Sequence, residues 1–222
     1  MREKGLKLRK RTVKTADKEE FDNTEYEKKY YEKGFGYVAG VDEVGRGPLA
    51  GPVVCAAVIM PKGEFIDGVD DSKRLSAKKR ESLAEIIKNT AVAYCIAEVS
   101  QEEIDRINIL QAVRKCMTDA VNGLSVKPDV TLVDGLDTNL PFNAEYIVKG
   151  DRKSYTVGCA SILAKTYRDA LMVKFAEDYP DYEFEKNKGY GSKKHIEAVK
   201  EKGPCRLHRK TFIKNFWVEQ EK

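Results

Sequence analysis

The chain has few cysteines, and they lack the spacing of a metal site or a disulfide framework. Five cysteines occur among 222 residues; they are widely separated and include no C-x-x-C pair. This pattern argues against a structural zinc site and against the disulfide scaffold of a secreted protein. Most of them lie in apolar runs, where cysteine serves as a small core residue. We therefore expect a reducing, cytoplasmic environment.

Long hydrophobic runs are also missing. The longest, residues 53–60, is far shorter than the roughly 20 residues that a membrane-spanning helix needs. The basic N-terminal stretch is not followed by the apolar core of a signal peptide. We also find no internal repeat and no low-complexity linker. These observations predict a soluble intracellular protein, built as one large domain or two small ones.

Charge is plentiful but unevenly placed. Charged residues make up 34% of the chain, and the formal net charge is only +4. Residues 1–14 hold seven basic residues and one acid, and residues 186–210 hold nine basic residues and two acids. Such stretches fit a polyanionic partner such as nucleic acid, but an ordinary solvated basic surface is an equal alternative.

The first 35 residues are interpreted as a charged N-terminal extension. It begins with the basic arm of residues 1–14. Tyr26, Tyr30 and Tyr31 then predict a short helix that docks on the body. Residues 36–222 follow as the main domain, and their C-terminal part is predicted to be helical.

Hydrophobic patterning predicts an α/β fold. Strands are expected at residues 37–42, 53–60, 91–99, 130–134 and 145–148. Helices are expected at residues 77–89, after Ser100 with Glu103 completing a capping box, and at 108–122, 156–179, 192–202 and 211–219. Three strands in succession, followed by strands separated by helices, predict a mixed sheet.

Two adjacent acids end the first predicted strand. Asp42 and Glu43 lie between an apolar run and a glycine-rich turn, residues 45–51. Carboxylates at the end of a buried strand are costly unless a cation neutralises them, and Mg2+ prefers such oxygen ligands. A solvated acidic turn is the alternative. Because successive strand residues point to opposite faces, the two acids share a site only if the chain already turns at Glu43.

Two further acids can join them. Asp134 ends the fourth predicted strand, so its carboxylate meets that of Asp42 if the two strands are neighbours. On the long predicted helix, Ser161, Lys165 and Asp169 are spaced four residues apart and share one face. Asp169 can therefore face the end of the sheet. The alternative is an ordinary surface ion pair between Lys165 and Asp169.

Motifs along residues 34–212 resemble those of type 2 ribonuclease H, and of bacterial ribonuclease HII in particular. The first is GVDEVGRGPLAGPV at residues 40–53. The others follow in the family's order: DSK at 71–73, EID at 103–105, NIL at 108–110, VDG at 133–135, VKGD at 148–151, ASILAK at 160–165, RD at 168–169, KGY at 188–190, HR at 208–209 and TF at 211–212. So many motifs in order are very specific.

The resemblance implies a fold and a metal site. The fold is the ribonuclease H-like fold, a five-stranded mixed sheet flanked by helices with a helical C-terminal part. The catalytic residues are Asp42, Glu43, Asp134 and Asp169, which would bind two Mg2+ or Mn2+ ions. Four carboxylates at one place repel each other unless cations balance them. Two ions about 4 Å apart suit in-line displacement at a phosphodiester.

The implied activity is that of an endoribonuclease. It hydrolyses the RNA strand of RNA/DNA hybrids and nicks duplex DNA on the 5′ side of embedded ribonucleotides, leaving 3′-hydroxyl and 5′-phosphate ends. The implied partners are these duplexes, and we expect a monomer that does not bind membranes.

Substrate-binding residues are assigned through the same resemblance. Glycines in the turn Gly45-Arg46-Gly47 let backbone groups approach a sugar closely. In the family, this turn and the tyrosine matching Tyr190 contact the 2′-hydroxyl that distinguishes RNA from DNA. The residues expected to contact phosphates are Lys73, Lys149, Lys165, His208 and Arg209. Asp151 and Ser161 are expected to support the acidic cluster. For Tyr190 the alternative is a packing role, and for His195 and His208 it is an ordinary surface position.

Other functions fit less well. The spacing Gly45-x-Gly47-x-x-Ala50 loosely matches a dinucleotide-binding fingerprint, but it leads into a strand instead of a helix. A P-loop is excluded because no Lys-Ser or Lys-Thr follows a G-x4-G. A non-catalytic nucleic-acid-binding protein would lack one of the four carboxylates. Ribonuclease HIII, the nearest alternative, has a much longer N-terminal domain and typically Glu at the position of Asp169.

Overall fold

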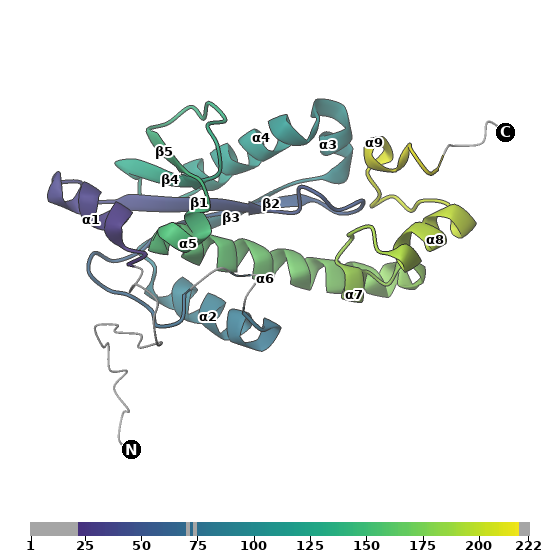
Figure 1. Ribbon diagram of the computed structural model, residues 1–222, viewed down its shortest axis with the longest axis horizontal. Coiled ribbons are helices and arrows are strands. Elements are labelled where there is room, and N and C mark those ends of the chain that lie inside the picture. Colours follow the sequence, from purple (N-terminus) through teal and green to yellow (C-terminus); the bar gives the residue numbers. More distant parts are fainter. Residues whose placement is uncertain (1–21, 70–71, 73–74, 218–222) are drawn as a thin grey trace, which may run out of the picture.

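A five-stranded sheet forms the centre of the protein (Figure 1). The computed structural model describes residues 22–69, 72 and 75–217, so the predicted basic arm of residues 1–14 and Lys73 lie outside the described residues. The strands are β1 (Val38–Val44), β2 (Val53–Ile59), β3 (Ala93–Val99), β4 (Val130–Asp134) and β5 (Ala144–Ile147).

The sheet is mixed, with the strand order β3-β2-β1-β4-β5. β2 pairs antiparallel with both β1 and β3, whereas β4 pairs parallel with both β1 and β5. All seven residues of β2 are buried, as expected for a strand that is covered on both faces. The five predicted strands and the mixed sheet are confirmed, with ends shifted by at most two residues.

Helices cover both faces of the sheet. The helical elements in chain order are α1 (Glu25–Glu32), α2 (Ala77–Thr90), α3 (Gln101–Ile107), α4 (Ile109–Asn122), α5 (Gly150–Lys153), α6 (Tyr155–Asp178), the 3-10 turn η2 (Pro180–Tyr182), α7 (Phe184–Asn187), α8 (Lys193–Lys202) and α9 (Lys210–Ile213). α4 packs on one face, and α6 with α2 beside it covers the other (Figure 1). No helix of the described residues is long and apolar enough to cross a bilayer.

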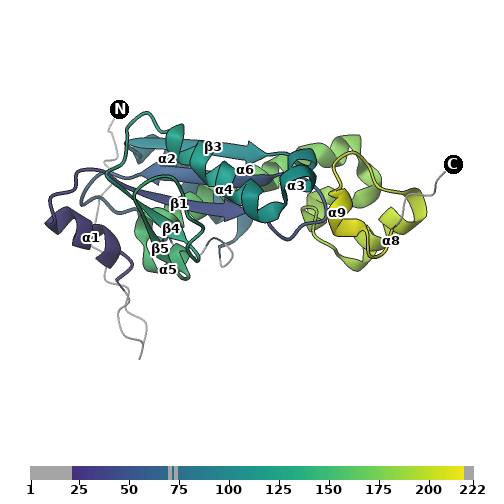
Figure 2. The same ribbon diagram turned by 90° about the horizontal axis from the view of Figure 1, so that it is seen from above.

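The long helix α6 lies directly on the central strand. A Cβ atom on Gly40 of β1 would stand 2.2 Å from the carbonyl carbon of Thr156, so no larger residue fits between the two elements. Beyond the sheet, α6 continues into the C-terminal part, where α7, α8 and α9 gather at one end of the molecule (Figure 2). This part has its own core, formed by residues that include Met172, Phe184, Val199 and Ile213.

Two predicted helical features differ from the structure. The helix expected at 211–219 is only the short α9, whose first amides are held by the carboxylate of Asp105 at 2.7 Å from Lys210 N and 3.0 Å from Thr211 N. Residues 214–216 form a turn after it. At α3, Ser100 accepts from the amide of Glu103, but the Glu103 carboxylate pairs with Arg106 instead of completing the capping box.

The predicted tyrosine-bearing helix is confirmed, and it does more than dock. Tyr26, Tyr30 and Tyr31 of α1 pack against the edge of the core. On the same helix Glu27, which is 1% exposed, accepts hydrogen bonds from the Thr156 amide at 3.0 Å and its hydroxyl at 2.7 Å. A carboxylate there also offsets the positive end of the α6 dipole. α1 thus caps the helix that carries part of the site.

We predict that Glu27→Ala destabilises the protein by about 1–3 kcal/mol, because it leaves buried donors at the start of α6 without an acceptor. The free energy of unfolding in urea measures this. Glu25→Ala is the matched control, since Glu25 is exposed on the same helix. Equal unfolding free energies for the two variants would show that Glu27 does not cap α6.

Candidate active site

Asp42 and Asp134 end two neighbouring parallel strands. In the pairing of β1 with β4, Val41 stands beside Val133, so the next residues are Asp42 and Asp134. Asp42 is 6% exposed, and Asp134 is partly buried. The expected meeting of the two strand ends is therefore what the structure shows.

Glu43 joins this pair without a turn in the chain. β1 continues through Val44, and Glu43 pairs with Cys55 of β2, whose side chain faces the α4 side of the sheet. Asp42 pairs with Ala56, which packs on the α6 side. The turn at Glu43 that a shared site required is absent, because the antiparallel pairing holds both residues in the strand, with their side chains on opposite faces. Their carboxylates nevertheless act on each other electrostatically.

Two of these acids have raised pKa values. The pKa of Asp42 is raised well above its ordinary value, first by burial and then by the negative charges of Glu43 and Asp134; a hydrogen bond from Ser161 opposes this. Burial also raises the pKa of Glu43, although the charge of Arg46, 3.3 Å away, lowers it. Asp42 is thus buried near two other carboxylates whose negative charges disfavour its ionised form.

A tight turn fixes Asp134. The amide of Gly150 donates to Asp134 Oδ1 at 2.5 Å. A Cβ atom on Gly150 would lie 3.2 Å from both the Cα and the Oδ1 of Asp134, closer than a side chain easily tolerates. Lys149, which precedes the turn, has a left-handed backbone (φ 61°) and an exposed position. Asp151 follows in α5 and is 8% exposed. The VKGD motif thus orients the strand-end carboxylate.

Asp169 forms an ion pair with two cations. Its carboxylate accepts from Lys165 Nζ at 2.7 Å and from Arg80 Nη2 at 3.3 Å. The i,i+4 pair that spacing alone offered as the alternative is therefore present. It involves a side chain that is only 17% exposed, so it is not an ordinary surface pair. Within the part of the chain that the structure describes, no hydrogen bond or ion pair links Asp169 to Asp42, Glu43 or Asp134.

Sequence reasoning missed Arg80. Its guanidinium reaches Ser72 O at 2.7 Å as well as Asp169, and the residue is 9% exposed. Ser72 in turn lies 2.9 Å, oxygen to oxygen, from Ser161, which also hydrogen-bonds Asp42. The sequence nevertheless contained an indication of its burial, because Arg80 has the helical spacing of Leu83, Ala84 and Ile87, the buried residues of α2. A cation on a core-facing stripe needs a partner.

The turn after Glu43 is held from inside by Arg209. This side chain is fully buried and donates to Gly45 O at 2.6 Å, to Arg46 O at 2.9 Å and to Gly51 O at 2.8 Å. Arg168 is also fully buried and donates to Ala50 O and Pro52 O, and to Lys188 O of the loop that carries Tyr190. Two guanidinium groups thus fix the carbonyls of the turn.

These positions correct two expected phosphate contacts. Arg209 has no exposed surface, and its donors are taken by carbonyls. His208 is 3% exposed, and its Nε2 lies 2.9 Å from Nε2 of His195. Neither side chain reaches a solvent-facing duplex; both are part of the support beneath the turn. His195, at 0% exposed, is not a surface residue either.

Tyr190 lies beside the same turn. A Cβ atom on Gly47 would stand 3.9 Å from Tyr190 Cε1, an ordinary contact distance. The Tyr190 side chain is 44% exposed, and the side chain of Arg46 is 53% exposed. The structure therefore brings the two elements expected to meet a ribose, the 45–47 turn and Tyr190, to one exposed place.

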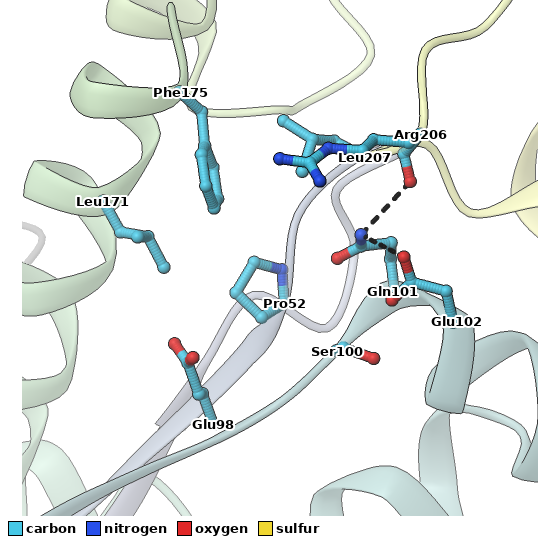
Figure 3. A pocket seen from close by; sticks show the side chains of 9 residues that line it. All are labelled: Pro52, Glu98, Ser100, Gln101, Glu102, Leu171, Phe175, Arg206 and Leu207. Atoms are coloured by element: carbon cyan, nitrogen blue, oxygen red, sulfur yellow. Dashed lines mark hydrogen bonds between the residues drawn. The ribbon is translucent and has the colours of Figure 1, made fainter. Parts of the chain in front are cut away.

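A separate hollow of about 220 Å³ lies where the body meets the C-terminal part (Figure 3). Leu171 and Phe175 project into it from α6, and Gln101 on the opposite side donates to Arg206 O at 3.1 Å. None of the acids of the site lines it. The candidate chemistry therefore does not lie in this hollow.

The acids fit divalent cations by their chemistry. Carboxylate oxygens are hard ligands, and the raised pKa values of Asp42 and Glu43 reflect negative charge that a cation would balance. Within the described residues, no three acidic, histidine or cysteine side chains are yet close enough to enclose an ion.

We predict that Asp42→Asn stabilises the metal-free protein at pH 8. Because the pKa of Asp42 is raised in the folded state, the stability it contributes is present below the ordinary aspartate pKa and is lost as pH rises through the raised value. Each kcal/mol of relieved repulsion should raise Tm by about 2–4 °C. The Tm of variant and wild type, measured in the presence of a chelator at a series of pH values from 8 downward, tests this. The difference in Tm should vanish near pH 3.5. Parallel curves for variant and wild type would contradict it.

Comparisons with known proteins agree on one family. The family model described as Ribonuclease HII matches residues 39–219. A ribonuclease HII of Caldicellulosiruptor bescii is 51% identical over 86% of this chain and 93% of its own. That of Endomicrobium trichonymphae is 56% identical over 84% of this chain and 90% of its own. The crystal structure of ribonuclease H2 from Pyrococcus horikoshii OT3 superposes with a TM-score of 0.68 at 28% identity, over 81% of this chain and 96% of that chain.

The match extends over the strand-end acids, the turn and the C-terminal part, and the chain therefore belongs to the ribonuclease HII family of endoribonucleases, which act on RNA paired with DNA.

Proposed function

We propose that this ribonuclease nicks duplex DNA on the 5′ side of an embedded ribonucleotide, using two Mg2+ or Mn2+ ions held by Asp42, Glu43, Asp134 and Asp169. The observation that carries the proposal is the placement of Asp42 and Glu43 just before the turn that adjoins Tyr190. Two of the acids and the 45–47 turn are then only a few residues apart along the chain.

When bound, the ions supply an activated water and stabilise the leaving 3′-oxygen. Asp42 and Asp134 give the site its rigid part, because both sit on paired strands and Asp134 is fixed by the Gly150 amide. Glu43 reaches the site from the other side of β1 and exchanges Arg46 for a cation. The protein residues thus provide charge and orientation.

Asp169 differs from the other three acids of the proposed metal site in its partners. It is neutralised by Lys165 and Arg80, so to hold a metal ion its carboxylate would have to give up one of these cations. The Lys165 ammonium would then be available to a substrate phosphate. Lys149 is exposed beside the Gly150 turn and is a second candidate for positioning the backbone without reading sequence.

Discrimination of RNA from DNA falls to the turn at 45–47 and to Tyr190. The carbonyls of Gly45 and Arg46 are held inward by Arg209, which gives this backbone one fixed shape against the sugar. The exposed Tyr190 ring adjoins Gly47. A single ribonucleotide offers one 2′-hydroxyl, so its recognition depends on this pair more than recognition of a continuous hybrid does.

The proposal is tested with a DNA duplex that holds one ribonucleotide, beside a uniform RNA/DNA hybrid, in Mg2+ and in Mn2+. We expect a nick on the 5′ side of the ribonucleotide with 3′-hydroxyl and 5′-phosphate ends. Asp134→Asn should lower turnover by several orders of magnitude on both substrates. Asp137→Asn, an exposed acid of the same loop, serves as the control and should cleave normally.

Two results would count against this. Cleavage of the uniform hybrid alone would remove the junction preference and indicate an activity of the ribonuclease HIII type. Near-normal turnover of Asp134→Asn at millimolar Mg2+ would refute the metal assignment.

We also predict that Tyr190→Phe weakens junction cleavage. Loss of one hydrogen bond should cost about 1–3 kcal/mol, or roughly 5- to 150-fold in rate, with a smaller loss on uniform hybrid, where many cleavage registers are available. Tyr94→Phe is the control, because Tyr94 on β3 is similarly exposed at 41%. If Tyr190→Phe leaves the ratio of the two rates unchanged, Tyr190 packs and the ribose is read elsewhere.

A further inference from the structure

The chain contains two histidines, and they meet in the core of the C-terminal part. His195 lies on α8 and His208 lies between α8 and α9; their Nε2 atoms are 2.9 Å apart. They are 0% and 3% exposed. The Phe184 ring stands edge-on to His195, with centroids 5.4 Å apart, and the Tyr182 ring stands edge-on to His208 at 4.8 Å. Water is excluded from the pair.

The backbone around the pair determines which nitrogen carries each proton. The amide of Cys205 donates to His208 Nδ1 at 3.0 Å, which favours an unprotonated nitrogen there over one that donates to the Cys205 carbonyl oxygen at 3.3 Å. A neutral His208 then holds its proton on Nε2 and donates it to Nε2 of His195. His195 must therefore carry its proton on Nδ1, which lies 2.8 Å from the carbonyl oxygen of Tyr190. Three hydrogen bonds run in one direction, from Cys205 to Tyr190.

The pair works only while both rings are neutral. A proton added at Nε2 of His195 would face the Nε2–H of His208, and one added at Nδ1 of His208 would face the amide of Cys205. Consistent with this, burial lowers the pKa of both histidines, that of His208 to about 4. The other titratable groups against the pair are the Tyr182 hydroxyl, which donates to Gly203 O, and the Cys205 thiol, 3.3 Å from His208 Nδ1.

The two ends of this chain of hydrogen bonds lie at the two ribose-facing elements. One end is the Tyr190 carbonyl itself. The other end is the Cys205 amide, and the backbone beside it is joined to the segment after the turn: His208 bridges to Ala50, and the amide of Arg209 donates to Leu49 O at 2.8 Å. The histidines thus tie the loop of Tyr190 to the strand-like segment that also holds the 45–51 turn.

We propose that His195 and His208 are positioning residues that hold Tyr190 against the 45–47 turn and so set the preference for a ribonucleotide junction. The inference rests on the proposed function of Tyr190. Neither histidine touches the substrate; both act through the backbone carbonyl of Tyr190. A loop fixed at its carbonyl presents the ring in one orientation, whereas a loose loop presents it in many.

The hydrogen-bond direction is tested on the unaltered protein. With only two histidines, ¹⁵N-labelled imidazoles give a spectrum of two rings. We expect opposite tautomers, Nδ1–H for His195 and Nε2–H for His208, with the pKa of both rings below the ordinary histidine value and that of His208 at about 4. Identical tautomers, or a ring that titrates near 6.5 as a free histidine does, would overturn the proposal even if no variant folds.

The effect on recognition is tested with paired variants. His195→Leu removes the donor to Tyr190 and should lower the ratio of single-ribonucleotide to uniform-hybrid cleavage by about 2- to 30-fold. His195→Asn places an amide N–H where Nδ1 was and should restore most of the ratio. Val199→Ala is the control for a loosened core, since Val199 is fully buried one turn away on α8; it should leave the ratio unchanged.

A double-mutant cycle separates this inference from the proposed function. In a Tyr190→Ala background, His195→Leu should change the ratio no further, because the ring it positions is gone. If the wild type prefers the junction and His195→Leu keeps the same preference, the positioning role is overturned and the proposed function stands. A wild type with no junction preference overturns the proposed function and, with it, this inference. A ratio lowered equally by Val199→Ala assigns the effect to general packing and also overturns the positioning role.

Discussion

The repulsion between carboxylates at the end of the central sheet is the constraint around which the site is arranged. β1 and β4 are parallel neighbours, so Asp42 and Asp134 end side by side in a place with little water. The polar groups around them, the Gly150 amide and the Ser161 hydroxyl, orient the charges without cancelling them. The protein therefore holds unbalanced negative charge at this end of the sheet, as expected where stability is exchanged for activity.

Two buried arginines hold the turn that follows Asp42 and Glu43. Arg168 and Arg209 come from distant parts of the chain, yet both donate to main-chain carbonyls of one turn, and Arg168 also donates to the Tyr190 loop. A guanidinium presents its donors in a fixed plane, so it sets the directions of several carbonyls at once. The turn that follows the acids is consequently held by cations on the side away from solvent.

Much of this architecture could be predicted from the sequence, because the relevant signals are local. Apolar runs located the strands, and Ser100, Asn108 and Ser192 each cap a helix as their residue types suggest. The acids at two strand ends indicated a shared site once the strands were taken as neighbours. The start of the short α9 was placed one residue late, and it is set by a tertiary contact with Asp105.

The directions of individual side chains could not be predicted in the same way. Motifs marked His208 and Arg209 as functional cations, but their partners are 13 and 158–164 residues away, and only packing shows that both are buried. Asp169 was placed correctly on its helix face, yet its pairing with Arg80 depends on α2 lying beside α6. The sequence alone determined the elements, the acids and the family, because periodicity, capping and motif spacing act within a few residues. Only the tertiary structure decided which charges are buried and which partners they take, because burial and hydrogen bonding depend on segments that are distant along the chain.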